Sequence, residues 1–152
     1  MLNNKNNRLG FSLLANILVS LGIIVLLSAI SIPYIRRYQP SLKLSAATKD
    51  LAGDLRLAQQ LTITEQVPHA VDLDLFNQDY QILSLDTATS TIKNIALDSE
   101  ISFNAGTTVS FVEFNSYGAV TGESVGTIVL ANSQGDTASI NIKPSGYIEV
   151  EN

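Results

Sequence analysis

The most restrictive feature of the chain is a run of 27 uncharged positions, residues 9–35, that lies between Arg8 and Arg36. Leu, Ile and Val dominate this run. As an α-helix it would be about 40 Å long, and the hydrocarbon core of a bilayer requires only about 20 residues. The buried helices of soluble proteins seldom carry an apolar stretch of this length. The run therefore predicts a membrane-spanning helix over residues 11–35.

The composition of the chain bounds its chemistry. Its 152 residues include 9 Lys and Arg, 14 Asp and Glu, one His and no Cys, for a net charge of −5. Without cysteine there is no disulfide framework, no thiolate metal site and no Cys nucleophile. The single histidine, His69, is interpreted as a structural residue at a helix-to-strand junction, on the surface or as a cap. We expect no metal, no cofactor and no enzymatic activity, because no nucleophile elbow and no phosphate-binding loop is present.

The spacing of the apolar residues divides the remainder of the chain into two parts. Over residues 36–66 the apolar side chains recur every three or four positions, which predicts an amphipathic continuation of the helix. After residue 66 the period becomes two, which predicts strands at 71–75, 80–85, 91–97, 109–114, 127–131, 137–143 and 147–150. Asp72, Asp74 and Asp79 lack the pattern of an EF-hand loop, so they are interpreted as the solvent-facing side of a hairpin and not as a calcium site. The predicted class is α+β, with a long helix packed on an antiparallel sheet or sandwich over residues 67–152.

A secretory signal peptide is the main competitor for the apolar run. Lys5 and Arg8 precede the run as a basic leader would. The apolar core of a signal peptide is usually about 7–15 residues, however, and ends at a small-x-small site. Cleavage near Ala29 stays open on spacing alone. The orientation also stays open, because Arg36 and Arg37 balance the two leading cations.

Residues 8–14, Arg-Leu-Gly-Phe-Ser-Leu-Leu, resemble the cleavage and methylation site of type IV prepilins and pseudopilins. The pattern of that family is a short basic leader, a Gly, then Phe-Thr/Ser-Leu-Leu/Ile-Glu and an apolar helix that ends near a Pro. The resemblance implies that a prepilin peptidase removes a leader, residues 1–10, by cutting between Gly10 and Phe11. It also implies N-methylation of Phe11. The helix would then lie in the cytoplasmic (inner) membrane, with the β domain outside the cytoplasm.

The chain departs from this family pattern at one important position. The family carries a Glu at the fifth mature residue, where this chain has Ala15, and counting back from Pro33 in the family spacing reaches Asn16 instead. Either the acidic site is absent, or Asn16 is a neutral stand-in that brings no charge. The family Glu is thought to pair with the N-terminal amine of the preceding subunit, so Ala15, Asn16 and Pro33 are candidate assembly residues. The departure predicts a minor component, placed at the tip or present in few copies.

Three further segments resemble the GspH/FimT group of pseudopilins. Residues 54–60 resemble its helix end, which reads Leu-Arg-x-Ala-Arg; residues 114–119 resemble its Phe-Asn-x-x-Gly turn; residues 142–148 resemble its closing strand-turn-strand. With the N-terminal motif they cover most of the chain. Some members of this group bind DNA through a basic C-terminal segment. Residues 146–151 are acidic here, which disfavours nucleic acid as a partner.

The resemblance implies a structural subunit of a type IV pilus, a competence pilus or a type II secretion pseudopilus. Its implied partners are other pilin or pseudopilin subunits, the prepilin peptidase, the inner-membrane assembly platform and the membrane. The predicted division is a leader at 1–10, a transmembrane helix at 11–35, its amphipathic continuation at 36–66 and a β domain at 67–152. One alternative from another class stays open: a signal-anchored extracytoplasmic β domain that binds a ligand or the cell wall as a monomer.

Overall fold

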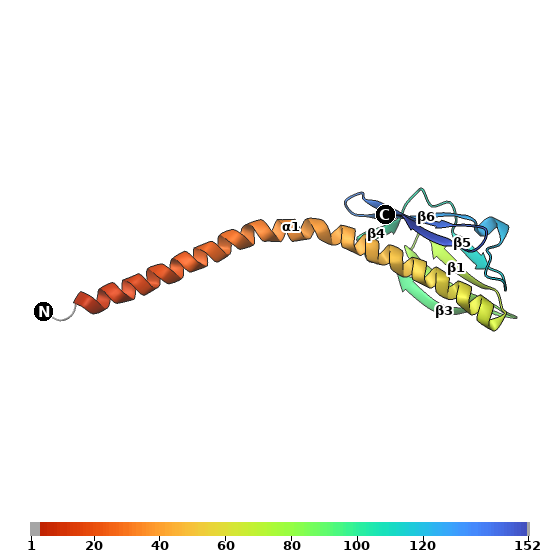
Figure 1. Cartoon of the computed structure of the whole chain (residues 1–152), viewed down its shortest axis with the longest axis horizontal. Helices are drawn as coiled ribbons and strands as arrows, with labels where there is room; N and C mark the ends of the chain where they lie inside the picture. The colour runs from red at the N-terminus through yellow and green to blue at the C-terminus, as the bar shows by residue number, and fades with distance from the viewer. Residues whose placement is uncertain (1–3, 152) are drawn as a thin grey trace. The chain divides into compact units, whose positions relative to one another are not determined.

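The computed structural model describes the backbone of residues 4–151 and the side chains of residues 11–30 and 38–151 (Figure 1). The elements are α1 (Asn4–Glu65), β1 (His69–Asp74), β2 (Asp79–Leu85), β3 (Thr89–Ala96), β4 (Ile101–Phe103), β5 (Phe111–Phe114), η1 (Gly122–Ser124), β6 (Gly126–Asn132), β7 (Thr137–Ile142) and β8 (Ile148–Glu151). The chain divides into two compact units, Met1–Gln39 and Pro40–Asn152. The predicted α+β class is confirmed.

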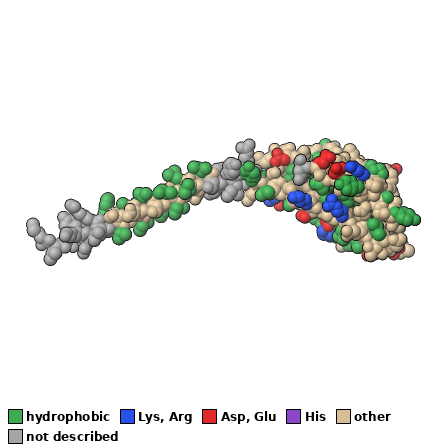
Figure 2. Space-filling model, viewed as in Figure 1, with side chains coloured by type: hydrophobic (Ala, Val, Ile, Leu, Met, Phe, Trp, Pro, Cys, Tyr) green, Lys and Arg blue, Asp and Glu red, His purple; other side chains and the backbone are tan. Residues whose placement is uncertain are grey.

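The described part of the N-terminal unit is an apolar helix without a core of its own. The segment Phe11–Ile30 is long and apolar enough to cross a membrane, and all of its side chains are exposed. Figure 2 shows apolar side chains along the visible face of this segment. The hydroxyls of Ser20 and Ser28 donate to carbonyl oxygens four residues earlier, at 2.9 and 2.8 Å. Both hydroxyls thus find a partner inside the helix, as an apolar environment requires.

The C-terminal unit contains two four-stranded antiparallel sheets. Their strand orders are β3-β2-β1-β5 and β4-β6-β7-β8. The predicted hairpin between β1 and β2 is confirmed, with Asp74 paired to Asp79. Asp74 Oδ1 accepts hydrogen bonds from the backbone N–H groups of Phe76 and Asn77, both at 2.9 Å. The bonds from Asn77, followed by the bond from Phe76, hold the pKa of the Asp74 carboxyl below its usual value. Asp74 is therefore the cap of this turn.

The part of α1 in the C-terminal unit supplies one wall of the core. Leu51, Leu55 and Ala58 are fully buried and belong to one apolar cluster with side chains of both sheets. Figure 1 shows this part of the helix, drawn in orange to yellow, lying along the strands. The apolar side chains of residues 44–58 thus form one stripe along the helix, as the spacing over residues 36–66 predicts. This stripe covers the sheets of the β domain. A domain this small needs that extra apolar burial.

Strand β3 forms one edge of its sheet and is almost wholly exposed. Its register against β2 shifts between Ile82 and Leu83, which pair with Lys93 and Thr91 and leave Ile92 as an extra residue. Such a bulge twists a strand and makes its outer edge a poorer template for another strand. Lys93 is engaged within the domain, as shown below. The long edge of this sheet is thus protected against pairing with other chains.

Candidate functional site

The residues of the predicted processing and assembly sites all lie in α1. Gly10 and Pro33 lie in the helix, but their surroundings fall outside the described side chains. Phe11 is 76% exposed, and Ala15 and Asn16 are exposed as well. The structure gives these five residues their place along the helix, and their roles stay predictions.

Three distant segments of the C-terminal unit meet at Gln59. Its side-chain Nε2 donates to the carbonyl oxygens of Gly118, at 2.6 Å, and of Gly146, at 3.0 Å. Both glycines have a positive φ, of 80° and 79°. A Cβ at Gly146 would overlap the carbonyl oxygen of Gly118, and a Cβ at Gly118 would lie 2.8 Å from Ile63 Cδ1. Both positions need glycine for its backbone freedom, and Gly146 also needs its lack of a side chain, because its neighbour is backbone.

The two turns that Gln59 joins present aromatic side chains to solvent. In the first turn, Asn115 Oδ1 accepts hydrogen bonds from the backbone N–H groups of Tyr117 and Ala119, at 3.0 and 3.2 Å. Tyr117 is 93% exposed and Tyr147, in the second turn, is 58% exposed. The ammonium of Lys143 lies 5.2 Å from the ring centre of Tyr147. The turns are therefore held by several bonds, while their tyrosines contact little of the domain.

Gln59→Leu should lower the free energy of unfolding by about 1–2 kcal/mol, because two carbonyl oxygens lose their donor. Gln59→Arg should restore most of the loss, since a guanidinium can donate to both oxygens. Urea unfolding of the full chain in detergent, followed by circular dichroism, measures the difference. Gln60→Leu, one residue further along α1 and exposed, is the matched control. Equal losses for Gln59→Leu and Gln60→Leu would show that the two bonds do not stabilise the fold.

A second polar cluster joins α1 to β2 and β3. Asp54 is buried, and it accepts hydrogen bonds from the Tyr80 hydroxyl at 2.8 Å and from Lys93 Nζ at 2.7 and 2.8 Å. Burial raises the pKa of the Tyr80 phenol, and the bond to Asp54 raises it further. Tyr80 is therefore a permanent donor, and the cluster links three elements of the fold. The sequence pattern did not predict it, because its members are 26 and 39 residues apart.

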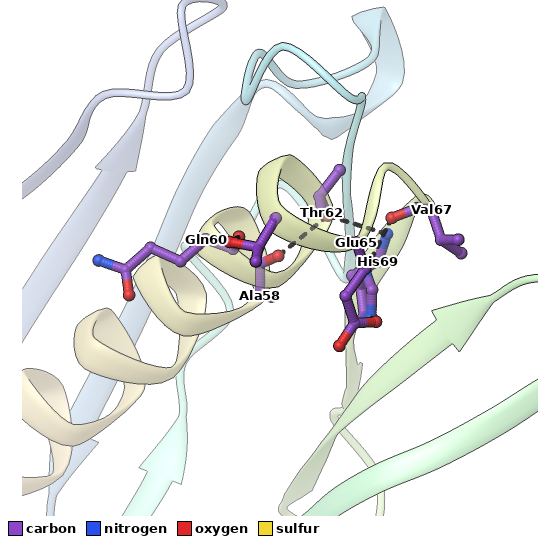
Figure 3. Close-up of polar contacts among 7 residues, drawn as sticks. Ala58, Gln60, Thr62, Glu65, Val67 and His69 are labelled. Atoms are coloured by element: carbon purple, nitrogen blue, oxygen red, sulfur yellow. Dashed lines mark hydrogen bonds and ion pairs between the residues drawn. The ribbon is translucent and has the colours of Figure 1, made fainter.

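His69 lies at the predicted junction of α1 and β1. Of its two predicted positions, on the surface or as a cap, the surface position is wrong. Its side chain is fully buried beneath the end of the helix (Figure 3). Nδ1 lies 2.8 Å from the carbonyl oxygen of Val67, Nε2 lies 3.3 Å from a carboxylate oxygen of Glu65, and the backbone N–H donates to Thr62 Oγ1 at 3.0 Å. These contacts place the end of α1 and the turn that follows it against His69. Within the described part of the chain, no three His, Asp or Glu side chains are grouped to hold a metal ion.

Solved structures share this architecture. The minor pseudopilin EpsH from the type 2 secretion system of Vibrio cholerae aligns with a TM-score of 0.59 at 13% identity, over 71% of this chain and 95% of that one. The type IV minor pilin FimU of Pseudomonas aeruginosa aligns with a TM-score of 0.62 at 12% identity, over 76% of this chain and 92% of that one. The chain has the fold of a minor pilin or pseudopilin. No protein-family model and no curated protein sequence matches it.

The pilin fold gives the C-terminal motifs of this chain a common location. Residues 54–60 contain Gln59, residues 114–119 contain Gly118, and residues 142–148 contain Gly146. The hydrogen bonds of Gln59 therefore join all three segments at one place. Each motif is short when taken alone. Their meeting point explains why two glycines and one long polar side chain occur at these spacings.

Proposed function

We propose that this chain is a minor pilin or pseudopilin, a structural subunit of a type IV pilus, a competence pilus or a type II secretion pseudopilus. Its fold, together with Arg8-Leu9-Gly10-Phe11 at the start of an exposed apolar helix, supports the proposal most directly. A prepilin peptidase would release Phe11, which would then be methylated. The apolar helix would hold the subunit in the inner membrane, with its β domain outside, until the assembly platform adds it to other subunits.

Processing is the first test of this proposal. Removal of residues 1–10 should leave a mature chain of 142 residues that begins at Phe11. Intact-mass measurement of the protein extracted from membranes should show that chain with one added methyl group. Gly10→Val should abolish the cut, because a β-branched side chain restricts the backbone and occupies the space that glycine leaves free. A chain that begins at Met1, or one cut near Ala29, would instead support a signal-anchored or secreted β domain.

The absence of the family Glu leads to a second, separate prediction, about how many copies of this subunit a filament contains. A buried N-terminal ammonium in a filament needs a partner, since an unpaired buried charge is costly. Ala15 offers no polar group and Asn16 offers no charge, so the natural chain should be a minor component. Introducing Glu at Ala15 or at Asn16 should raise its share of the filament. Quantitative mass spectrometry of sheared filaments measures that share. A natural chain that already forms most of the fibre would show that the acid is dispensable.

A further inference from the structure

A hollow lies between α1 and the sheet that contains β2 and β3. Its volume is about 220 Å³. Ala46 and Ala47 line it from the helix, Tyr80 and Ile95 line it from β2 and β3, and Leu97 lines it from just after β3. The small alanine side chains leave the space, and the larger apolar side chains form the floor. Ala47, Ile95 and Leu97 are half-buried and pack against the core, so the floor is a fixed part of the domain.

The rim of this hollow has more negative than positive charge. Lys43 is the one cation among the lining residues, and it is already paired with Asp98 at 3.2 Å and with Glu100 at 2.9 Å. Asp50 lines the hollow from α1 and is exposed. The lining thus carries two carboxylates, Asp50 and Asp98, against one ammonium that Asp98 and Glu100 already neutralise. Such a site is complementary to a group with an apolar stem and a cationic end.

The charge of the whole unit disfavours a second copy of the domain and nucleic acid as occupants. Residues 40–152 hold 5 Lys and Arg and all 14 Asp and Glu, so their net charge is 5 − 14 = −9. Lys93 and Lys143 are also paired with acids inside the domain. A second copy would be repelled by like charge, as would nucleic acid. A more basic protein would instead be attracted to this rim, and we infer that it supplies the cation.

We propose that the hollow beside Ala46 and Asp50 receives a lysine or arginine side chain of a neighbouring, more basic protein. The methylene stem lies against Ile95 and Leu97, and the charged end reaches Asp50. This inference rests on the proposed function, in which assembly would bring another chain against the domain. It deepens that function by assigning the site and the chemistry of the partner.

The test uses the full chain in a nonionic detergent, with methyl groups labelled for NMR. The probe is n-pentylammonium, which has the stem and the charge of a lysine side chain, and n-pentanol is its uncharged match. At constant ionic strength, the ammonium should shift the methyl signals of Ala46, Ala47, Ile95 and Leu97 in a saturable titration. Asp50→Asn should weaken binding about threefold, as expected for one exposed ion pair. Asp86→Asn, an exposed acid beyond the other end of β2, should leave binding unchanged.

A second variant tests the cavity itself. Ala46→Leu keeps a good helix former at an exposed helix position and fills the hollow, so it should abolish the saturable shifts. Gln60→Leu makes a similar change away from the hollow and should not. Three results would overturn the proposal: no saturation up to about 100 mM probe, equal binding of pentanol, or equal binding to the Asp50→Asn variant. If the chain is processed between Gly10 and Phe11 but does not bind the probe, the proposal for the hollow fails and the proposed subunit role stands. If an unprocessed chain binds the probe saturably, the binding site stands and the proposed subunit role fails.

Discussion

Gly146→Ala should lower the free energy of unfolding by about 3 kcal/mol or more, among the largest losses expected for a single methyl group. The backbone at Gly146 has a φ of 79°, which already strains any residue with a Cβ. The added carbon would also overlap the carbonyl oxygen of Gly118 and press on the amide of Gln59. That overlap is with backbone, so a change of side-chain rotamer cannot relieve it. The two turns must separate, and Gln59 then loses both of its acceptors.

Gly135→Ala is the matched control for this substitution. Gly135 also has a positive φ, of 87°, but a Cβ there would meet no atom within 4 Å. Its cost should therefore be the backbone strain alone, about 1–2 kcal/mol. Urea unfolding of the full chain in detergent, followed through the near-ultraviolet signal of its tyrosines, compares the two variants. If both lose the same stability, the close approach of the two turns contributes nothing beyond backbone conformation.

Lys93→Met should lower the free energy of unfolding by about 2 kcal/mol, because it leaves the Asp54 carboxylate buried without a cation. Breaking a fully buried ion pair costs about 3–5 kcal/mol. The loss here should be smaller, since the side chain of Lys93 is 49% exposed and water screens part of the attraction. Asp54 would retain only the hydroxyl of Tyr80 as a partner.

The double variant Asp54→Asn, Lys93→Met isolates the charge. An Asn at this position still accepts the hydrogen bond from Tyr80 and has no charge to neutralise. The double variant should therefore recover to within about 1 kcal/mol of the natural chain. Lys43→Met, which removes exposed ion pairs on the same side of the helix, should change stability little. Urea unfolding as above measures all three, and a double variant no more stable than Lys93→Met would reject the account.

Periodicity predicted most of this fold, because the elements of the chain are regular over many residues. The apolar run, the stripe of residues 44–58 and the hairpin at Asp74 all appear as predicted. The strand β4 was not predicted, since its three residues show only Ile101 and Phe103 buried around an exposed Ser102. An alternation of that length does not stand out from a loop. The position of β4 depends on its pairing with β6, about 30 residues away, and no local pattern carries that information.

The polar contacts that join the elements were beyond reach of sequence reasoning for the same reason. Gln59 and its two acceptors are separated by 59 and 87 residues, and nothing marks a glutamine as a donor to two turns. His69 follows a proline at the end of a helix, which is a usual place for an exposed residue. It is buried because the end of α1 and the following turn pack against it, and that packing depends on how the helix lies on the whole sheet. The roles predicted for Gly10, Phe11, Ala15, Asn16 and Pro33 would depend on partners outside this chain.

The distribution of polar bonds along α1 also has a mechanical consequence. Asp54, Gln59 and Thr62 each bind a different part of the β domain, through Tyr80 and Lys93, through the two glycine turns and through the backbone of His69. These three anchors lie within nine residues of the helix, about 13 Å of its length, and Arg56, which donates to the carbonyl oxygen of Ile148, lies among them. Lys43 adds exposed ion pairs nearer the start of this part of the helix. A force along the axis of α1 would therefore be shared by the bonds that join the helix to the β domain. The helix should therefore detach from the sheets only when these bonds break together. Until then, the β domain should move with the helix as a rigid unit.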